Sequence, residues 1–341
     1  IAGYNIRTMR LEEHLSMLEE ELNKIKWDVI GLSETRLKSE TVTTLKSGHV
    51  LFQKNSDVNA HVGGVALLVN KKIKHLVTKT RAISARILYL VMKLNSKCNI
   101  QVIQAYAPTS ASTDEEHEKF LEDLTTAKSA EKTRFTIMTG DFNSKIGQKT
   151  QTDSPYIGTF GLKERNQRGQ EMMNFLSKEK IYCMNTFFKK HPKRKWTWKS
   201  PDNSTKNEID YVLVTDKRIC VDVSVLNRFD TGSDHRLVRA KIQVNTRLER
   251  KRLMEKKIRP TMAELKGKEE EYNTYIKKKF CPVEDLKGLP LRELTSKITS
   301  SIRTAVKQVC SLCPRRNPKI SPDTERLIEE KSTKPLQTTL T

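Results

Sequence analysis

The sequence predicts an α/β fold with four layers, in which two mixed, mostly antiparallel sheets pack face to face between outer layers of helices. Two observations lead to this fold class. Strand-like segments rich in Val, Ile, Leu and Tyr recur through the first 245 residues, several of them with no helix between. They fall into two halves, the first ending at Asn143, and both halves also contain helix-like segments.

The chain opens with a strand, a helix and a second strand. Residues 2–7 (AGYNIR) predict the first strand. Apolar residues spaced three or four apart from Leu11 to Ile25 predict an amphipathic helix, because this spacing places them on one helical face. The near-continuous apolar run in residues 28–35 (DVIGLSET) is typical of a strand that is buried on both faces.

More strands complete the first half. Four of them are expected at residues 50–53, 64–70, 87–94 and 100–106. Because these segments follow one another without helices, we expect them to pair in an antiparallel arrangement. A helix starting at Ser112 or Thr113, with glutamates placed for a capping box, then leads into a strand at residues 136–143 (TIMTGDFN).

The second half has a similar texture. A helix is expected at residues 169–178, followed by strands at residues 181–188, 195–200, 208–214, 221–227 and 235–244. Residues 1–245 are expected to form one domain. Beyond it, residues 246–330 predict a basic, mainly helical extension, and the Thr-rich residues 331–341 predict a disordered tail.

The composition is strongly basic. The 341 residues include 63 Lys and Arg against 41 Asp and Glu, which gives a net charge of +22. This balance favours a polyanionic partner, above all nucleic acid. No apolar run approaches the ~20 residues that a membrane span needs and no signal peptide opens the chain, so we expect an intracellular protein without a membrane partner. The start at Ile1, within a strand-like run, predicts a fragment of a longer protein.

The end of the strand at residues 136–143 carries candidate catalytic groups. Side chains alternate between the two faces of a strand, so Asp141 and Asn143 are expected to point the same way. A carboxylate that can deprotonate water, next to an amide that can hold a phosphate oxygen, suits phosphoryl chemistry. Gly140 would let a neighbouring backbone or a ligand come close. The alternative is an ordinary turn that uses Asp and Asn for its backbone geometry.

Other predicted strands also end in polar residues. These residues are Asn5, Glu34, Tyr106, Asp210, Asp234 and His235. Catalytic sites are often assembled from strand ends in this way. Structural roles remain open as alternatives: Asn5 and Asp210 could cap turns, Glu34 could pair with Arg36 in solvent, and the aromatic residue and the histidine could be structural.

Six short motifs resemble a known family. In chain order they are YNIR, SET, AYAP, GDFN, EIDYVLV and SDH, and they span residues 1–245. In this order they resemble the endonuclease/exonuclease/phosphatase superfamily, which includes deoxyribonuclease I and the apurinic endonucleases. The stretches GDFNSKIG, NQRG, WTWKSPDN and NEIDYVLV are most similar to the endonuclease domain of non-LTR (LINE-type) retrotransposons and to the craniofacial development protein 2 group.

The resemblance implies a metal site. Glu34 would be the main Mg²⁺ ligand, Asn5 would lie beside it, and Asp234 would lie near a second metal position. Mn²⁺ would be an alternative ion. Carboxylates combined with water and a substrate phosphate suit Mg²⁺ in proteins, which supports this assignment independently.

The resemblance also implies catalytic roles. Asp141 would orient or deprotonate the attacking water, and Asn143 would help bind the scissile phosphate. Tyr106 would contact the same phosphate. His235, held by Asp210, would stabilise the charge that develops on it, because a carboxylate behind a histidine fixes the tautomer and favours the protonated ring.

A segment at residues 187–199 (FFKKHPKRKWTWK) interleaves aromatic and basic residues, a composition expected of a surface that contacts a nucleic-acid backbone. The candidate contacts are Lys189, Lys190, Lys193, Arg194, Lys195 and Trp198. The alternative is a strand pair whose aromatic residues pack inward while its lysines are merely solvated.

The predicted function is a Mg²⁺-dependent endonuclease that nicks DNA, as the target-nicking domain of a retrotransposon endonuclease–reverse transcriptase. Two alternatives are a phosphatase of the same fold and a non-catalytic nucleic-acid-binding protein derived from a transposon. DNA is the expected partner, element RNA is a further one through the basic extension, and the nucleus is the expected place of action. Arg7 stands where apurinic endonucleases carry Asp, so specificity for abasic sites is not implied.

Overall fold

The computed structural model describes residues 1–55, 63–96, 98–244, 266–280 and 290–309. The chain divides into two compact units, residues 1–246 and residues 247–341. The predicted disordered tail lies outside the described residues. Among the helices that are described, none combines the length and the apolar character needed to cross a membrane.

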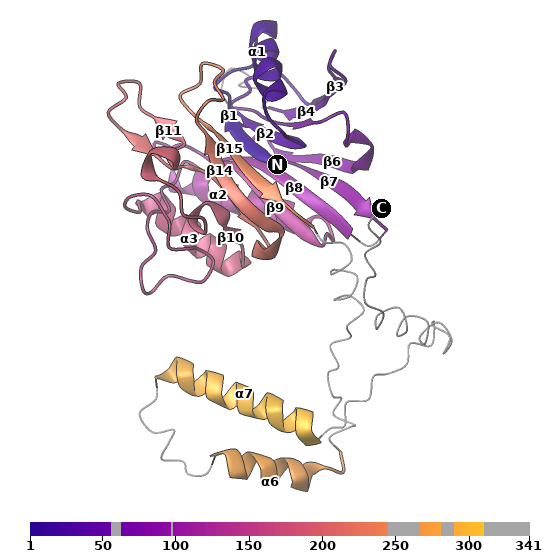
Figure 1. The fold of residues 1–341 in the computed structure, drawn as a ribbon, viewed down its shortest axis with the longest axis vertical. Coiled ribbons are helices and arrows are strands. Elements are labelled where there is room, and N and C mark those ends of the chain that lie inside the picture. Colours follow the sequence, from indigo (N-terminus) through magenta and orange to yellow (C-terminus); the bar gives the residue numbers. More distant parts are fainter. Residues whose placement is uncertain (56–62, 97, 245–265, 281–289, 310–341) are drawn as a thin grey trace, which may run out of the picture. The chain divides into compact units, whose positions relative to one another are not determined.

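Two sheets form the first unit (Figure 1). In spatial order, the first sheet contains β14 (Cys220–Leu226), β15 (Leu237–Ile242), β1 (Ala2–Asn5), β2 (Val29–Ser33), β5 (Val65–Val69), β4 (Val50–Lys54) and β3 (Thr41–Thr44). The second contains β10 (Tyr182–Cys183), β13 (Asp210–Val214), β9 (Phe135–Asp141), β8 (Cys98–Tyr106), β7 (Ile87–Asn95) and β6 (Val77–Ser84). A separate short hairpin joins β11 (Trp198–Lys199) to β12 (Lys206–Asn207).

Each sheet contains one parallel strand pair, and the other pairs are antiparallel. β1 and β2 are parallel and are connected through α1 (Glu12–Asn23), while β8 and β9 are parallel and are connected through α2 (Asp114–Ser129). A parallel pair requires such a crossover connection, because the chain must return to the same end of the sheet. The prediction of mixed, mostly antiparallel sheets is confirmed.

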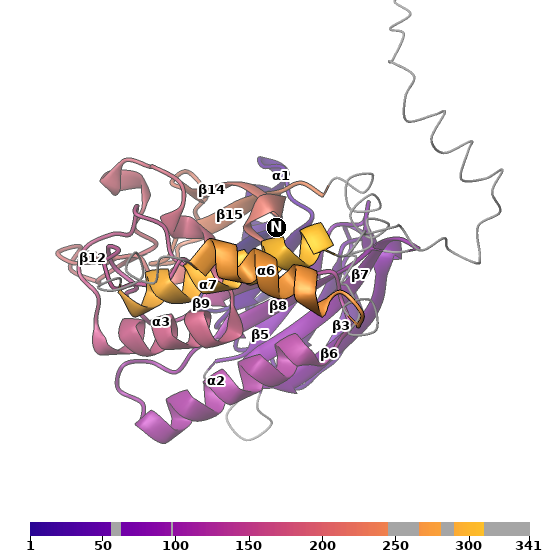
Figure 2. The ribbon, with the colours of Figure 1, turned by 90° about the horizontal axis from the view of Figure 1, so that it is seen from below.

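Three separate cores show that the unit has four layers. One core lies between the sheets and contains Val29 and Leu67 from the first sheet with Leu90 and Val102 from the second. A second core packs α1 on the first sheet. The third packs α2 and α3 (Gln167–Glu179) on the outer face of the second sheet. Figure 2 shows α2 and α3 side by side on this face, where the Lys128 ammonium of α2 pairs with Glu179 of α3 at 2.7 Å.

Helix ends follow the sequence signals. The side chain of Thr113 accepts a hydrogen bond from the backbone N–H of Glu116, which caps α2 at the predicted start. Asn166 caps α3 in the same way, with the N–H of Gly169 as donor. Lys180 directly follows α3 as its C-cap and adopts the left-handed conformation with φ of 58°.

The two sheets approach closely beneath the polar strand ends. Gly3 of β1 lies against Thr139 of β9, and a Cβ atom at position 3 would come within 2.2 Å of the Thr139 hydroxyl. Gly31 of β2 lies against the side chain of Gln104 on β8, which leaves no space for a Cβ atom. The two glycines therefore allow the parallel strand pairs of both sheets to meet at one edge.

Several predicted strands need correction. Residues 181–188 form only the two-residue strand β10, because the chain turns into a 3₁₀ helix at Met184–Thr186. The strand expected at residues 195–200 is also reduced to two residues, β11. β3 and β6 were not predicted. All four residues of β3 are exposed, so no apolar alternation marks it. The four strands expected from residue 50 to 106 form two antiparallel pairs, β4 with β5 and β7 with β8. The first pair belongs to one sheet and the second pair to the other.

The second unit contains two described helices, α6 (Glu269–Phe280) and α7 (Leu291–Val309). The α7 side chains of Ala305 and Val309 are buried, and the Lys268 ammonium donates to the Val309 carbonyl at 3.0 Å. At the other end of α7, Leu291 is 80% exposed. The bond from Lys268, which directly precedes α6, thus ties the start of α6 to the last residue of α7.

Candidate active site

The strand order explains why the predicted residues meet. β1 and β2 end on the same side of the first sheet, and β8 and β9 end on the same side of the second, because each pair is parallel. A hydrogen bond between Asn5, the last residue of β1, and Asp141, the last residue of β9, shows that these two edges meet. β13 runs antiparallel to β9, so its first residue, Asp210, lies opposite the last residue of β9, Asp141. Tyr106 lies opposite Asp141 on the other side. β15 is antiparallel to β1, and His235 therefore precedes β15 at the same edge.

Asn5 joins the two sheets at this edge. Its side-chain amide donates to Oε1 of Glu34 at 2.8 Å and to Oδ2 of Asp141 at 3.0 Å. Its Oδ1 accepts a hydrogen bond from the backbone N–H of Arg7 at 2.9 Å. Asn5 is buried, so these contacts fix its amide plane. The structure therefore places Asn5 as a bridge between the two carboxylates.

Asp210, His235 and Asp141 form a buried row. Nδ1 of His235 lies 3.0 Å from Oδ2 of Asp210, and Nε2 of His235 lies 3.8 Å from Oδ2 of Asp141. Burial alone would lower the pKa of His235, but the charge of Asp210, helped by Asp141 and Asp234, raises it. The imidazole ring therefore remains protonated above neutral pH.

Asp141 has the opposite balance. Burial raises the pKa of this carboxyl group, and the neighbouring Asp210 charge raises it further. His235, the backbone N–H of Asn143 and the amide of Asn5 lower it again. A buried carboxylate with a raised pKa next to a cation is well suited to accept a proton near neutral pH.

Two further predicted residues line this row. The Asn143 side-chain amide donates to the Ala107 carbonyl at 2.9 Å, which leaves its Oδ1 and a second amide hydrogen for a ligand. Tyr106 belongs to the core between the sheets, as the structural alternative expected. Burial, followed by the charges of Glu34 and Asp141, raises the pKa of the Tyr106 hydroxyl, which is therefore a hydrogen-bond donor at neutral pH.

Glu34 lies at a more open lip of the site. Its side chain is 21% exposed, and Oε2 accepts from the Arg36 guanidinium at 3.2 Å, so the pairing considered as an alternative does occur. Arg7, Glu34, Arg36 and Asn143 all have positive φ, between 45° and 66°. Residues other than glycine seldom adopt this conformation, which costs on the order of 1–3 kcal/mol each and is typical of functional loops.

The Asp234 carboxylate is held by a tryptophan side chain. Its Oδ2 accepts from Nε1 of Trp198 at 3.1 Å. Within the described chain, no hydrogen bond links it to Glu34 or Asn5. Sequence reasoning passed over the adjacent Ser233, whose hydroxyl donates to the Asn5 carbonyl at 2.7 Å and accepts from the His235 N–H. The position of this serine within the SDH motif was the available signal.

Only some of the side chains predicted to contact nucleic acid are exposed. Lys195 is 5% exposed and its ammonium pairs with Glu208 at 3.2 Å, so the expectation that it contacts nucleic acid is wrong. The Lys190 ammonium is paired with Asp222 at 2.6 Å. Trp198 uses its indole N–H on Asp234. The side chains that remain exposed are those of Lys189, Lys193 and Arg194. Phe187 and Phe188 pack against the core between the sheets, as the alternative expected.

Two groups of atoms at this edge could hold a divalent cation. Asp141, Asp210 and His235 each offer a ligand atom within 4.8 Å of the others. However, the Asp210 carboxylate and the imidazole ring already bind each other, and all three side chains are buried. The partly exposed carboxylate of Glu34, next to the Asn5 amide, is the more accessible set of oxygen atoms and has the chemistry that Mg²⁺ prefers.

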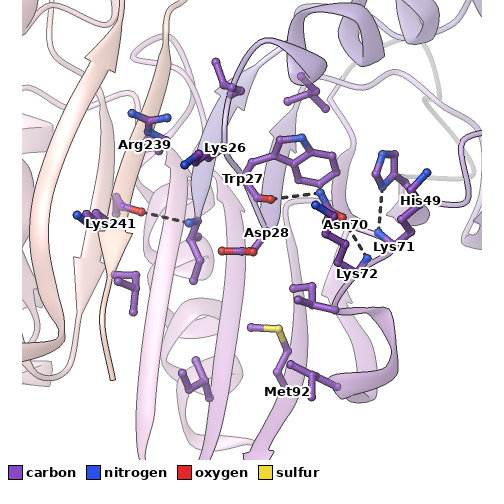
Figure 3. A pocket seen from close by; sticks show the side chains of 18 of the residues that line it. Lys26, Trp27, Asp28, His49, Asn70, Lys71, Lys72, Met92, Arg239 and Lys241 are labelled. Atoms are coloured by element: carbon purple, nitrogen blue, oxygen red, sulfur yellow. Dashed lines mark hydrogen bonds between the residues drawn. The ribbon is translucent and has the colours of Figure 1, made fainter. Parts of the chain in front are cut away.

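A large pocket of about 1230 Å³ lies elsewhere, at the opposite end of β1 and β2. Figure 3 shows Trp27, Asp28 and Asn70 at its wall, with lysines from β15 and from the turn after β5 around it. Ile1 and Val244, the first and last described residues of this unit, also line it. The pocket shares no residue with the polar strand ends described above, and it is not the candidate active site.

Comparisons with known proteins agree with the fold and with the family resemblance. The model of the "Endonuclease/Exonuclease/phosphatase family" matches residues 2–235. Members of this family are typically metal-dependent hydrolases of phosphodiester bonds. Craniofacial development protein 2 from Tragulus javanicus is 29% identical over 251 residues, 73% of this chain and 43% of that protein. Its counterpart from Bos taurus is also 29% identical, with 41% of its length matched. The chain thus spans less than half the length of these relatives.

Solved structures share the fold at low sequence identity. The endonuclease domain of TRAS1, a telomere-specific non-LTR retrotransposon, is 16% identical with a TM-score of 0.50, covering 72% of this chain and 98% of that domain. The catalytic domain of Xenopus laevis APE2 is 16% identical with a TM-score of 0.51 (71% and 90% covered). The AP endonuclease LMAP from Leishmania major is 16% identical with a TM-score of 0.52 (72% and 87% covered).

Proposed function

Because the chain belongs to the endonuclease/exonuclease/phosphatase family, we propose that it is a Mg²⁺-dependent endonuclease that nicks DNA. The single observation that carries the proposal is the continuous series of side-chain contacts that extends the buried row to the open lip: Glu34–Asn5–Asp141–His235–Asp210. It joins an accessible carboxylate to a buried carboxylate and a protonated histidine at one edge. Retrotransposon endonuclease and AP endonuclease domains among the structural neighbours favour DNA as the substrate.

The residues of the row have separate roles in the proposed reaction. Asp141 accepts a proton from the attacking water, since burial keeps its pKa raised. The water oxygen forms a bond to phosphorus and the bond to the 3′ oxygen breaks. The leaving 3′ oxygen takes a proton from solvent water, so the products are a 3′-hydroxyl and a 5′-phosphate. The imidazolium of His235 stabilises the charge on the phosphoryl oxygens, while Asn143 and Tyr106 donate hydrogen bonds to the same group.

A metal ion would bind at Glu34 with help from Asn5, and Asp234 is the proposed ligand near a second position. A bound metal ion would offset negative charge on the phosphate and on the leaving oxygen. The chain's own residues already prepare this site, because the Asn5 amide fixes the position of the Glu34 carboxylate. The Arg36 guanidinium balances the Glu34 charge in the absence of a cation.

The exposed basic residues Lys189, Lys193 and Arg194 are proposed to contact the DNA backbone. A 3′-hydroxyl at a nick could prime DNA synthesis, and the natural place of action would be nuclear DNA. Lys195 is no longer part of this surface, since its ammonium is buried against Glu208.

The proposal is tested by nicking of supercoiled plasmid in Mg²⁺ and in EDTA. We expect Mg²⁺-dependent nicking that falls by at least about 10³-fold in Asp141→Asn and in Glu34→Gln, because each loses a charge on which the proposed reaction depends. Binding to a labelled duplex should be unchanged in both variants. Glu122→Gln, on the exposed face of α2, is the matched control and should nick normally.

Two outcomes would count against the proposal. Cleavage that survives Glu34→Gln would remove Glu34 from the metal site. A parent protein that is folded and binds plasmid but never nicks it in Mg²⁺ or Mn²⁺ would favour a non-catalytic nucleic-acid-binding protein.

A further inference from the structure

Thr197 lies beneath the Asp210–His235 pair and is completely buried. Its hydroxyl oxygen accepts two backbone hydrogen bonds, from the N–H of Ile209 at 3.0 Å and from the N–H of Asp210 at 3.1 Å. Ile209 directly precedes β13, and Asp210 is its first residue. The side chain of Thr197 therefore fixes the point at which Asp210 enters its strand.

The main chain of the same residue contacts the strand that carries the histidine. The Thr197 carbonyl accepts from the N–H of Arg236 at 2.7 Å, and Trp198 forms a β-bridge with His235. Thr197 is thus bonded on one side to Asp210 and on the other to the neighbour of His235. β13 and β15 belong to different sheets, so the Asp210–His235 contact joins the two sheets at this edge.

A second buried group holds Asp210 from its carbonyl side. The Asn185 amide donates to the Asp210 carbonyl at 3.0 Å. Asn185 is itself held by Lys195, whose ammonium donates to the Asn185 carbonyl at 2.9 Å and pairs with Glu208. Both backbone groups of Asp210 are therefore fixed by groups outside the β-ladder, which orients its carboxylate toward the imidazole ring.

We propose that Thr197 is a positioning residue that sets the distance and orientation between Asp210 and His235 through its hydroxyl group. The inference deepens the proposed nuclease function and rests on it for its kinetic test. Thr197 does not touch the reacting atoms; it acts through Asp210. Loss of the hydroxyl leaves two buried N–H groups without their acceptor, and the start of β13 must shift to satisfy them.

The experiment compares Thr197→Val with Thr197→Ser in the full chain. Valine keeps the shape and loses the acceptor, whereas serine keeps the acceptor and loses only a methyl group. We expect Thr197→Val to lower kcat for plasmid nicking by about 10–100-fold, with KM changed by less than about twofold, because misplaced catalytic groups slow chemistry rather than binding. Thr197→Ser should recover most of kcat.

Thr139 supplies a matched control. It is also a fully buried threonine of the same unit, but its hydroxyl has no hydrogen-bond partner within the described part of the chain. Thr139→Val should therefore leave kcat unchanged. If Thr197→Val nicks at the parental rate, or if Thr197→Ser loses as much as Thr197→Val, the proposed role of the hydroxyl is overturned.

Amide hydrogen exchange separates this inference from the proposed function. Exchange at the N–H groups of Ile209, Asp210 and Arg236 should become faster in Thr197→Val and stay unchanged in Thr139→Val. This result requires no activity, so it holds even if the parent never nicks DNA. Equal exchange in parent and Thr197→Val overturns the inference. If Thr197→Val does not fold, Thr197→Ala, which also lacks the hydroxyl, replaces it in both measurements.

Discussion

The candidate site has two halves with different physical character. The buried half consists of Asp141, Asp210 and His235, and the open half consists of Glu34, Arg36, Arg7 and Asn143. Side chains of the buried half are at most 7% exposed and stand on or beside strands in regular register. Residues of the open half lie in loops, and all four have positive φ. The geometry of one half is therefore set by the sheets, and that of the other by strained turns.

This difference suggests a division of labour. In a buried row, a histidine and two carboxylates keep a fixed arrangement because water cannot replace their contacts. In the open half, the backbone stores strain and the Glu34 carboxylate is reachable from solvent, as a site that must admit a cation and a phosphate requires. Substitutions in the buried half should cost activity or stability heavily, whereas a substitution that relieves a positive φ in the open half can raise stability.

The largest effect is expected when the buried half loses a charge. Asp210→Asn keeps the size of the side chain but removes the anion that orients and protonates His235. We expect kcat for nicking to fall by about 10³–10⁴-fold, as when a carboxylate behind a catalytic histidine is neutralised. Because Asp210 raises the pKa of His235, the protonated form persists to higher pH in the parent, and the alkaline limb of the pH–rate profile should move to lower pH in the variant.

Asp28→Asn is the control for that measurement. Asp28 is an exposed aspartate at the opposite end of β2, beside the pocket in Figure 3. The Asp28→Asn variant should nick plasmid at the parental rate. A kcat within a few-fold of the parent in Asp210→Asn would show that the carboxylate does not act through His235.

The next largest effect concerns the buried ion pair of Lys195 and Glu208, which supports the buried half, and it is measured as a change in the free energy of unfolding. Lys195→Met leaves the Glu208 carboxylate buried without its cation, which should lower the free energy of unfolding by about 3–5 kcal/mol. The double variant Lys195→Met with Glu208→Gln should recover most of this loss. Lys128→Met, which breaks the more exposed pair between α2 and α3, should cost only about 1 kcal/mol. Urea denaturation measures all three.

The pH dependence of this loss gives a sharper test. Burial raises the pKa of Glu208 from 4.5 to about 7 although Lys195 lowers it, so the folded state holds this proton more tightly than the unfolded state. The contribution of Glu208 to stability therefore falls as pH rises from 4.5 to 7. Without Lys195 the pKa rises further, so Lys195→Met should be less destabilised at about pH 5 than at about pH 8. An equal loss at both values would contradict a buried, unpaired carboxylate.

The sequence contained enough to predict the buried half and the fold. Asp141 ends the mainly apolar strand β9 and Asp210 begins the apolar strand β13, and every residue of both strands is buried. Buried strands have one register, so the position of each polar residue follows from the pattern. The four-layer architecture follows from the same strands, since each must cover two faces. The sequence did not reveal the role of Lys195, because its partner Glu208 lies on the other side of the β11–β12 hairpin and only the fold brings the two together.

The open half was harder to predict for a different reason. Its strain depends on backbone angles, and Arg7, Glu34 and Arg36 carry no residue-type signal for positive φ, where Gly or Asn would be the usual choice. Similarly, β3 is an exposed polar strand whose pairing with β4 is decided by backbone hydrogen bonds. In both places the backbone, which the sequence pattern describes poorly, determines the outcome.

The smallest effect tests whether the open half stores strain. Arg7 has φ of 66°, its side chain is exposed, and only its backbone N–H takes part in a described hydrogen bond, to Asn5. Arg7→Gly removes the steric cost of this conformation, of order 1 kcal/mol or more, but adds entropy to the unfolded chain that offsets part of the gain. We expect a net stabilisation of about 0.5 kcal/mol in urea denaturation.

Arg10→Gly, at a nearby exposed arginine without positive φ, should instead be neutral or destabilising. Nicking by Arg7→Gly should change by roughly threefold or less, since one exposed charge contributes little. If both variants are destabilised equally, the positive φ at Arg7 carries no strain, and the contrast between the two halves is one of burial alone.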